Sequence, residues 1–430
     1  MTTFLQFLIG LAVLVAAALP VAAVLAVLAL LMSALWLPFP LQDVLGVIAW
    51  NQSQAYVLVA VPLFILLGEI MLRSGSAGRM YGAIAPWLSR LPGELMHTNI
   101  ASCALFAATS GSSVATAATV GTVAVPEIHG RGYNERLFLG SLAAGGTLGI
   151  LIPPSINMIV YGALTNTSVP QLYLAGFVPG LVLTAAFMMT IGIACLIRPD
   201  WGGRPAPATW TDRRRGLPHL LPPLVLFLVV VGSIYAGIAT PTEAAALGVL
   251  AALGIAAFDR ALSFPMLHRA FEGTMKTTAM LMLILLAAFF LNFGIASVGF
   301  VNALNDFVTH LGWGPVGTMA AVVAFYLALG CVLDGLSLTV LTVPVLTPVV
   351  VNLGYDPVWF GVIVMLVTEA GLITPPIGMN CYVVQGVRGA GRLDDVFIGV
   401  LPFLGAMLAV IALLIAFPGI ALWLPRSVFG

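Results

Sequence analysis

Two stretches of the chain combine hydroxyl or carboxyl side chains with flexible backbone in sequence that is otherwise apolar. The first is Ser110-Gly111-Ser112-Ser113, and the second is Asp334-Gly335-Leu336-Ser337. Hard cations prefer oxygen ligands, which here are hydroxyls, a carboxylate and the backbone carbonyls that an interrupted helix exposes. The two stretches therefore predict sites for a hard cation.

A helix-breaking segment follows each stretch. The first contains Gly149 and the pair Pro153-Pro154, and the second contains Gly371 and the pair Pro375-Pro376. Proline has no backbone N–H and frees the carbonyl four residues earlier, so each break supplies an acceptor. Lipid leaves free backbone groups unsatisfied, which confines such breaks to protein-lined or water-filled sites. Broken apolar helices at matching places in two halves of a chain are typical of the binding site of a secondary transporter.

The Ser- and Gly-rich stretches also have a purely structural interpretation. Small residues let membrane helices approach closely, so such tracts can serve packing alone. Their pairing with a Pro-Pro break favours a binding role instead. Asp334 favours the same role, because a carboxylate in lipid costs about 2.5–3.5 kcal/mol on insertion scales unless it faces a cation, a partner or water.

Composition places most of the chain in a membrane. Of the 430 residues, 61% are hydrophobic and 7% are charged, whereas soluble domains carry about 25% charged residues. The zero net charge argues against nucleic acid as a partner. The four cysteines and five histidines lack the spacing of a metal site, so no transition metal and no organic cofactor are expected.

The apolar runs predict an all-α polytopic membrane protein embedded in the lipid bilayer. The first run, from Phe4 to Trp36, spans 33 residues, which suits a long or tilted helix at about 20 residues per crossing. It has no basic residue before it and is too long for a signal-peptide core. Further crossings are expected at about 55–72, 137–165, 171–197, 220–240, 243–258, 277–296, 358–386 and 397–424.

Two remaining apolar stretches, at about 98–127 and 316–350, predict either two thin helices or a hairpin that enters the membrane and returns. If both are re-entrant hairpins and the N-terminus is cytoplasmic, fifteen of the sixteen Lys and Arg residues lie inside and Arg426 lies outside. A single crossing at 98–127 would place the groups around Arg79 and Arg131 on opposite sides and remove this bias. The charge distribution therefore favours hairpins.

The same arrangement makes the two halves inverted repeats. Residues 297–314 contain no Lys or Arg, so the second hairpin is expected to enter from outside, whereas the first enters from the arginine-bearing side. Two sets of identical residues support a duplication. Gly75, Gly93, Gly111 and Ser113 match residues 224 positions later, and Pro126, Gly132, Tyr133, Phe138, Gly149, Pro153 and Pro154 match residues 222 positions later.

These features predict five parts of the chain. They are an N-terminal transmembrane helix with a periplasmic connection, a first repeat, a cytoplasmic linker, a second repeat and a C-terminal transmembrane helix, at residues 1–54, 55–197, 198–219, 220–400 and 401–430.

Three further acids lie in or near the predicted spans. Glu69 stands four residues before Arg73, which favours an ion pair on one helix face. Glu243 follows Thr240 at a helix start, which favours a cap. Glu369 precedes the second break, where a role in the site, a role in gating and a structural role all stay open. No Lys or Arg lies inside a predicted span, so an anionic solute would need helix N-termini, hydroxyls, amides and co-bound cations.

Together these motifs resemble the large membrane subunit of TRAP (tripartite ATP-independent periplasmic) transporters. The likeness covers about residues 55–400, in the family's order, and rests on the segments Gly68 to Gly75, Ala108 to Thr116, Gly149 to Pro154, Thr240 to Ala245 and Gly371 to Asn380. It implies an elevator-type transporter of the bacterial inner membrane in which a sodium gradient drives uptake of a small organic acid. It also implies two separate partner chains, a periplasmic substrate-binding protein and a small four-helix membrane subunit.

The resemblance further implies two sodium sites with the solute between the two tips. The implied ion-binding residues are Ser110, Ser112, Ser113, Gly145 and Gly149 in the first repeat and Asp334, Ser337, Thr339, Gly371 and Thr374 in the second. The implied substrate-binding residues are Gly111, Pro154, Asn157, Gly335, Pro376 and Asn380. Leu336 interrupts the family pattern at the second tip, so the hydroxyl that binds there stays open. Which organic acid is carried is not encoded in these motifs.

Two alternatives remain beside this interpretation. A stand-alone sodium- or proton-coupled carboxylate carrier of the elevator class would share the inverted hairpins and need no receptor. An intramembrane hydrolase would use Asp334 or Ser110 chemically, but it needs a second aspartate or a basic residue within a span, and the sequence has neither. We therefore expect a transporter and not an enzyme.

Overall fold

The computed structural model describes residues 6, 7, 9–11, 13, 14, 17, 19–204 and 208–429. Within these ranges every regular element is a helix, and one isolated antiparallel bridge joins Tyr133 to Gly202. The all-α prediction is therefore confirmed for the described part of the chain. Seven of its helices are long and apolar enough to cross a membrane, or nine if each of two bent helix pairs counts as one span.

The first half of the chain holds a helical hairpin and a broken helix. The bounds are α2 Val21–Trp36, α3 Gln42–Ser53, η1 Tyr56–Val59, α4 Ala60–Arg73, α5 Ser76–Leu88, α6 Glu94–Ser110, α7 Ser113–Ala124, α8 Glu127–Arg131, α9 Glu135–Gly146, α10 Leu148–Leu151, α11 Ile156–Thr165 and α12 Val169–Ile197. The α6–α7 hairpin covers the first predicted re-entrant stretch. Helices α9 and α10 run into α11 with a bend of 43° at the Pro153-Pro154 break.

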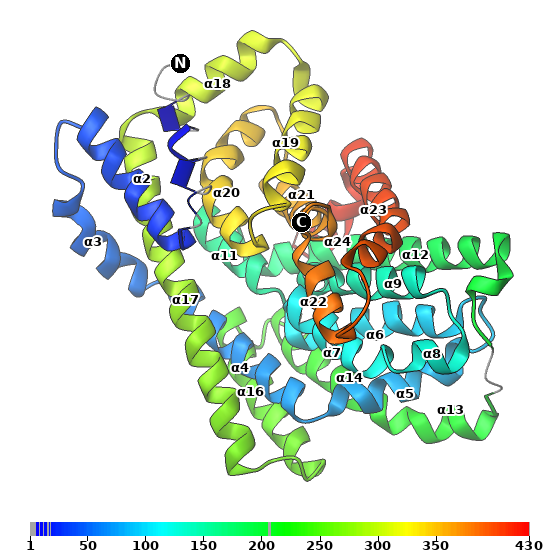
Figure 1. Ribbon diagram of the computed structural model, residues 1–430. Coiled ribbons are helices and arrows are strands. Elements are labelled where there is room, and N and C mark those ends of the chain that lie inside the picture. The colour runs from blue at the N-terminus through cyan, green and yellow to red at the C-terminus, as the bar shows by residue number, and fades with distance from the viewer. Residues whose placement is uncertain are drawn as a thin grey trace.

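The second half repeats this plan after a short linker. The bounds are η2 Pro199–Trp201, α13 Trp210–Gly216, η3 Leu217–Leu220, α14 Leu221–Phe227, the π-helical η4 Leu228–Gly232, α15 Ser233–Tyr235, α16 Pro241–Phe258, α17 Phe264–Ser297, α18 Phe300–Leu311, α19 Gly314–Gly330, α20 Gly335–Asn352, α21 Pro357–Ile373, α22 Met379–Arg388, α23 Leu393–Ala416 and α24 Gly419–Phe429. Helices α19 and α20 form the second hairpin. Helix α17 runs along one side of the molecule beside α2 and α4 (Figure 1).

Elements α4 to α12 and α17 to α23 follow the same order. In each series a glycine with positive φ separates the first two helices, Gly75 in one and Gly299 in the other. A hairpin and a helix broken at a Pro-Pro pair follow, and both pairs contain a cis peptide bond. The helix that leaves each tip is capped by Ser112 or by Asp334, which are 222 positions apart. The offset between the two tips is therefore 222, so Gly111 and Ser113 are not the structural equivalents of Gly335 and Ser337, which the offset of 224 had matched to them.

Prolines divide two segments that the sequence predicts as single helices. In the N-terminal run, α2 begins at Val21 directly after Pro20, whose backbone is extended. Residues 4, 5, 8, 12, 15, 16 and 18 of that run lie outside the described residues. Near the C-terminus, α23 ends at Ala416 because Phe417 precedes Pro418, and a residue before proline is displaced from helical angles. Helix α24 then begins anew.

The predicted cytoplasmic linker contains one short helix. Thr209 caps the start of α13, and the Asp212 side chain accepts a hydrogen bond from the Thr209 N–H in return, which completes a capping box. Helix α13 then packs beside α5 (Figure 1).

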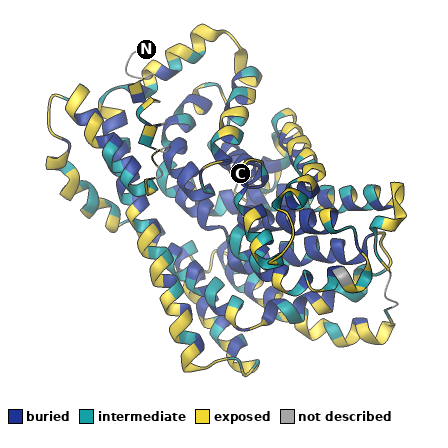
Figure 2. Ribbon diagram, in the orientation of Figure 1, coloured by how far each residue is buried: buried dark blue, intermediate teal, exposed yellow. Residues whose placement is uncertain are grey.

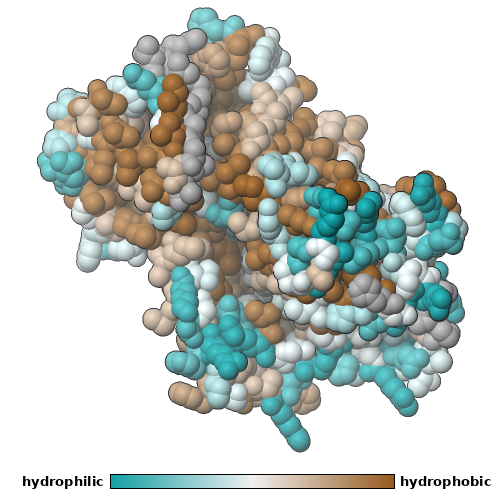
Figure 3. Space-filling view, viewed as in Figure 1, coloured by the Kyte–Doolittle hydropathy of each residue, from teal (hydrophilic) through white to brown (hydrophobic). Residues whose placement is uncertain are grey.

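Buried residues concentrate where the hairpins meet the broken helices, whereas α18 exposes most of its surface (Figure 2). Hydrophobic residues cover much of the face seen in Figure 3, and hydrophilic residues form separate patches on it. The closest packing joins α9 to α23. A methyl group at Gly399 would lie 1.8 Å from the carbonyl oxygen of Arg136, and one at Gly140 would lie 2.0 Å from that of Gly399.

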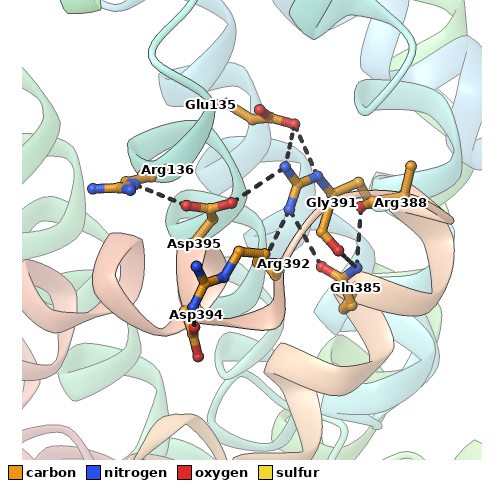
Figure 4. Close-up of polar contacts among 9 residues, drawn as sticks. Glu135, Arg136, Gln385, Arg388, Gly391, Arg392, Asp394 and Asp395 are labelled. Carbon is orange, nitrogen blue, oxygen red and sulfur yellow. Dashed lines mark hydrogen bonds and ion pairs between the residues drawn. The ribbon is translucent and has the colours of Figure 1, made fainter.

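Charged residues pair between distant parts of the chain. Arg388, the last residue of α22, donates to Glu135 at the start of α9 at 2.8 Å and lies 3.5 Å from Asp395 (Figure 4). Arg136 donates to the same aspartate at 2.9 Å. Arg388 is 8% exposed in its side chain. This network fastens the start of α9 to the connection between α22 and α23.

Candidate functional site

The tip of the first hairpin packs against the first break. Gly111 adopts a left-handed conformation with φ of 60° and lies so close to the break that a methyl group there would be 2.9 Å from the Pro154 carbonyl oxygen. A methyl group at Gly149 would lie 2.6 Å from the carbonyl oxygen of Ser112. The absence of a side chain at both positions therefore allows the backbone of the tip to contact the backbone of the break.

Hydroxyl groups organise this first tip. The Ser112 side chain accepts a hydrogen bond from the Ala115 N–H and caps α7. Ser110 and Thr116 share a hydrogen bond of 2.8 Å between their hydroxyls, and the Thr116 hydroxyl also lies 2.8 Å from the Ser112 carbonyl oxygen. The first positions of α7 thus present free backbone N–H groups and several hydroxyl oxygens at one place.

The second tip is built around Asp334. Its Oδ1 accepts hydrogen bonds of 3.1 Å from the N–H groups of Leu336 and Ser337, and the Ser337 hydroxyl donates to Oδ2. The carboxylate therefore caps α20. Behind the tip, a methyl group at Gly371 would lie 2.6 Å from the Gly330 Cα, so hairpin and break touch through glycines.

At the tips themselves, two of the contacts cross from one repeat to the other. The Ser113 hydroxyl, at the first tip, donates a hydrogen bond to Glu369 Oε1 in α21. At the second tip, Asn157 Nδ2 of α11 would lie 3.5 Å from a methyl group at Gly335. Each tip thus rests on its own break and reaches the broken helix of the other repeat.

A cavity of about 560 Å³ opens between the two tips and helices α4 and α17. Its polar wall consists of Glu69, Ser110, Ser112, Ser113, Asn157, Thr277 and Asp334. Apolar side chains such as Ile65, Phe106 and Leu372 form the rest of the wall. A small solute of mixed polarity fits such a lining, since binding pockets are mostly apolar with a few directing polar groups.

The wall of this cavity has no Lys or Arg among the described residues that line it. Of its two carboxylates, Glu69 is paired with Arg73 at 2.7 Å and Asp334 is occupied in capping. The N-terminal end of α7, whose first turn holds no acid, is therefore a source of attraction for an anion, whereas the N-terminal end of α20 already carries the Asp334 carboxylate.

The structure brings most of the sequence-predicted residues to the tips and breaks. Gly145 is an exception, because it packs on Cys103 of α6, where a methyl group would lie 2.9 Å from the sulfur. Thr339 and Thr374 donate to carbonyls of their own helices, those of Gly335 and Ala370. Pro376 and Pro375 are exposed, whereas Pro153 and Pro154 are buried. Whether these residues bind ions or solute stays a prediction.

Several buried polar atoms near the site have no hydrogen-bond partner within the described ranges. They are Asn157 Nδ2, Thr368 Oγ1, Glu369 Oε2 and both side-chain atoms of Asn380. Such atoms are costly to bury unless something bonds them, so they favour a polar occupant nearby. Asn380 is fully buried behind the cavity wall, unlike Asn157, which lines it.

Sequence reasoning left Glu369 open and did not single out Thr368. A carboxylate in the middle of the apolar run 358–373 was the available signal for Glu369, and its partner Ser113 comes from the other half of the chain. The two other acids have the local roles that their spacing favours. Glu69 pairs with Arg73, and Glu243 completes a capping box with Thr240, whose N–H it accepts at 2.8 Å.

Residues 8–420 match the model of the family described as "Tripartite ATP-independent periplasmic transporter, DctM component". The chain belongs to this family. The resemblance inferred from the motifs is confirmed, and the protein is a multi-pass permease of the inner membrane. Members of this family are transporter components, which sets the hydrolase alternative aside.

Three similar proteins are large permeases of TRAP transporters. The C4-dicarboxylate permease DctM of Pseudomonas aeruginosa is 32% identical over 89% of both chains. The sialic acid permease SiaM of Vibrio cholerae is 31% identical over 97% of both chains. The ectoine permease TeaC of Halomonas elongata is 34% identical over 86% of this chain and 87% of its own.

Two solved transporters share the fold at low sequence identity. The YdaH transporter of Alcanivorax borkumensis superposes with a TM-score of 0.58 at 15% identity, covering 95% of this chain and 97% of its own. The MtrF efflux pump of Neisseria gonorrhoeae gives 0.61 at 13% identity, with 93% and 94% covered. At these identities the likeness shows the fold alone.

Proposed function

We propose that the chain is the solute-carrying subunit of a sodium-coupled importer of a small organic acid. The observation that carries this proposal is the cavity between the two tips, whose polar wall offers hydroxyls, an amide and carboxylates but no basic side chain among its described residues. An organic anion in such a site needs co-bound cations, and the oxygen-rich tips suit sodium. Two of the relatives are named as permeases for acids, C4-dicarboxylates and sialic acid, which supports the same substrate class.

The two sodium ions are assigned to the tips and their breaks. Ser110, Ser112 and Ser113 with the backbone around Gly149 hold one ion, and Asp334 and Ser337 with the backbone around Gly371 hold the other. The solute lies between Gly111 and Gly335, within reach of Asn157. The close backbone contact between each tip and its own break supports this assignment.

In the proposed topology the two repeats are inverted and the N-terminus is cytoplasmic. Three ion pairs support it, because each joins residues that the charge distribution puts on one side. Arg79 pairs with Asp259 and Arg388 pairs with Glu135 on the inner side. Arg426 lies 3.9 Å from Asp356 on the outer side.

The transport step is proposed to be an elevator movement of the hairpins and broken helices past α4 and α17. Glu69 and Leu72 lie near the arginine-bearing end of α4, and Thr277 lies next to Lys276 on α17. Since these residues line the cavity, the site stands close to the proposed cytoplasmic side. This position supports the inward end of the movement as the conformation described here.

Two partner chains complete the proposal. A periplasmic binding protein delivers the acid, and a small four-helix membrane subunit braces this permease. The tripartite family description supports both partners.

Reconstitution in vesicles tests the function directly. The chain, its small subunit and its binding protein are placed in proteoliposomes with an inward sodium gradient, and uptake of labelled C4-dicarboxylates and sialic acid is measured. We expect uptake only when the binding protein and the sodium gradient are both present. Uptake without the binding protein would instead favour a stand-alone carrier, and uptake without any sodium gradient would contradict the coupling.

A further inference from the structure

A second cavity lies between α6 of the first hairpin and helices α5, α12 and α14, and it shares no lining residue with the cavity between the tips. It has a volume of about 480 Å³, and its wall is apolar apart from Thr184. Helices α5, α6, α12 and α14 each contribute to the wall. Its rim is open to the outside, because Leu181, Leu224 and Trp87 are each more than 40% exposed.

The groove is deep enough to take a large part of an acyl chain within one leaflet of a bilayer. It extends along α6 from Ala101 to Ala108 and from Leu220, at the end of η3, along α14 to Phe227. At 1.5 Å per residue each edge is about 10 Å long, close to the roughly 15 Å of hydrocarbon in one leaflet. Phe177 and Phe227, with ring centroids 5.9 Å apart, stand at the inner end. An acyl chain fits this space.

A basic and aromatic cluster stands at the other end of the groove. Arg213 of α13 lies over the rings of Trp87 and Trp210, at 6.0 and 5.9 Å from their centroids, and donates to the Pro86 carbonyl at 3.0 Å. Tryptophan and arginine at this position are typical of the lipid headgroup level. Trp87 also lines the groove, so the cluster and the apolar wall form one continuous surface.

Two neighbouring arginines remain available at this end. Arg214 lies over the Trp210 ring at 5.7 Å, and Arg215 follows it; both are exposed. Neither forms an ion pair with an acid in the described part of the chain. The nearest acid in sequence, Asp212, is engaged by Thr209 in the capping box. Asp212 still interacts electrostatically with Arg215. Exposed positive charge next to an apolar groove is complementary to an anionic headgroup that carries acyl chains.

We propose that this groove binds an anionic phospholipid, with an acyl chain along α6 and α14 and the phosphate at Arg214 and Arg215. The inner leaflet follows from the proposed topology, and the binding itself does not depend on it. The site is separate from the cavity between the tips. It borders α6, so the bound lipid fills the space between the first hairpin and the linker.

Photolabelling tests the site without measuring transport. The full chain, expressed with its small subunit, is reconstituted in phosphatidylcholine vesicles that contain a little phosphatidylglycerol or phosphatidylethanolamine, each with the same diazirine-bearing acyl chain. Labelled peptides are mapped by mass spectrometry. We expect phosphatidylglycerol to label the groove segments of α6, α12 and α14 about fivefold more than phosphatidylethanolamine does.

Paired variants distinguish recognition of the headgroup by the arginines from binding of the acyl chain in the groove. The double variant Arg214→Gln/Arg215→Gln should bring groove labelling by phosphatidylglycerol down to the level of phosphatidylethanolamine. The control Arg260→Gln/Arg269→Gln, which changes two other exposed arginines, should leave the preference intact. Ala104→Phe, which fills the groove, should lower labelling by both lipids at this site alone.

Three results would overturn the proposal. They are equal labelling of the groove by the two lipids in the unmodified protein, an unchanged preference in Arg214→Gln/Arg215→Gln, and absence of label from the groove when the small subunit is present. The last result would mean that the partner subunit covers this surface. Because Arg214 and Arg215 are exposed, their substitution should not disturb folding, so the test does not depend on whether Ala104→Phe folds.

Discussion

The Ser113 hydroxyl donates a hydrogen bond to Glu369 across 256 positions of sequence. It ties the first hairpin tip to the broken helix of the other repeat. Glu369 is completely buried, and its second oxygen has no partner within the described residues. A buried carboxylate of this kind depends strongly on the one donor that it has, since losing a partner exposes the full desolvation cost of the group. This hydrogen bond therefore links the first tip directly to α21.

A double-mutant cycle measures this link. Ser113→Ala removes a proposed sodium ligand and the donor to Glu369, so we expect a loss of about 1–3 kcal/mol in stability and a several-fold rise in the sodium concentration needed for uptake. Glu369→Gln keeps a carbonyl acceptor of the same shape but replaces the carboxyl group by an amide. Because the two residues are in contact, the effects of the two changes should not add in the double variant.

Thr122→Ala is the matched control for this cycle, because it removes a hydroxyl that bonds within α7 to the Thr119 carbonyl. Its sodium response should equal that of the unmodified protein. Additive effects of Ser113→Ala and Glu369→Gln on both thermal stability and sodium response would show that the two residues act independently.

Asp334 has two separable roles, capping α20 and carrying charge at the second tip. Asn caps helices about as well as Asp, so Asp334→Asn should express and melt normally. Its transport should be strongly reduced and partly restored by high sodium, because the charge that we propose holds the ion is gone. Wild-type uptake by Asp334→Asn at ordinary sodium would make the charge dispensable.

Two further variants divide the roles at this tip. Asp334→Ala removes the cap as well and should cost about 0.5–2 kcal/mol of stability in addition. Ser337→Ala removes a donor to the Asp334 carboxylate and a proposed ion ligand, so it should raise the sodium requirement several-fold. Thermal melting in detergent and sodium titration of uptake report the two effects separately.

The contact between α9 and α23 depends on the absence of side chains. Gly399→Ala places a methyl group 1.8 Å from the Arg136 carbonyl oxygen, so the helices must separate. We expect destabilisation of about 1–3 kcal/mol or more, as for other overpacked sites. Gly405→Ala lies on the same helix with nothing within 4 Å and should be neutral or slightly stabilising. Similar melting temperatures for the two variants would contradict this account of the interface.

Cysteine labelling in intact cells tests the proposed topology. Gly130→Cys lies beside Arg131 on the proposed inner side, and Asn352→Cys lies beside the loop to Asp356 on the proposed outer side; both positions are exposed. The four native cysteines are buried, so background labelling should be low. A membrane-impermeant maleimide should label the Asn352→Cys variant alone. Equal labelling of the two positions would exclude the inverted arrangement.

The sequence by itself determined those features whose causes lie within a few residues. The apolar runs, the Pro-Pro breaks, the Glu69–Arg73 pair and the Thr240–Glu243 capping box all depend on spacings of about one helical turn or less. Family membership was also readable, because its motifs keep their order along the chain. Pro20 and Pro418 stand inside continuous apolar runs, which predict unbroken helices. The helix boundaries beside these prolines nevertheless follow from the local effect of proline on the backbone.

Only the tertiary structure decided which groups meet at the site. Hydropathy treats Gly145 and Gly149 alike, yet the first faces Cys103 and the second faces the Ser112 backbone. The Asp334 carboxylate caps α20, and Glu369 accepts a hydrogen bond from Ser113 in the other half of the chain. Contacts of this kind depend on the rotation and depth of whole helices, which the packing of many side chains sets together. The local pattern fixes what each segment is, but close packing in three dimensions fixes what it touches.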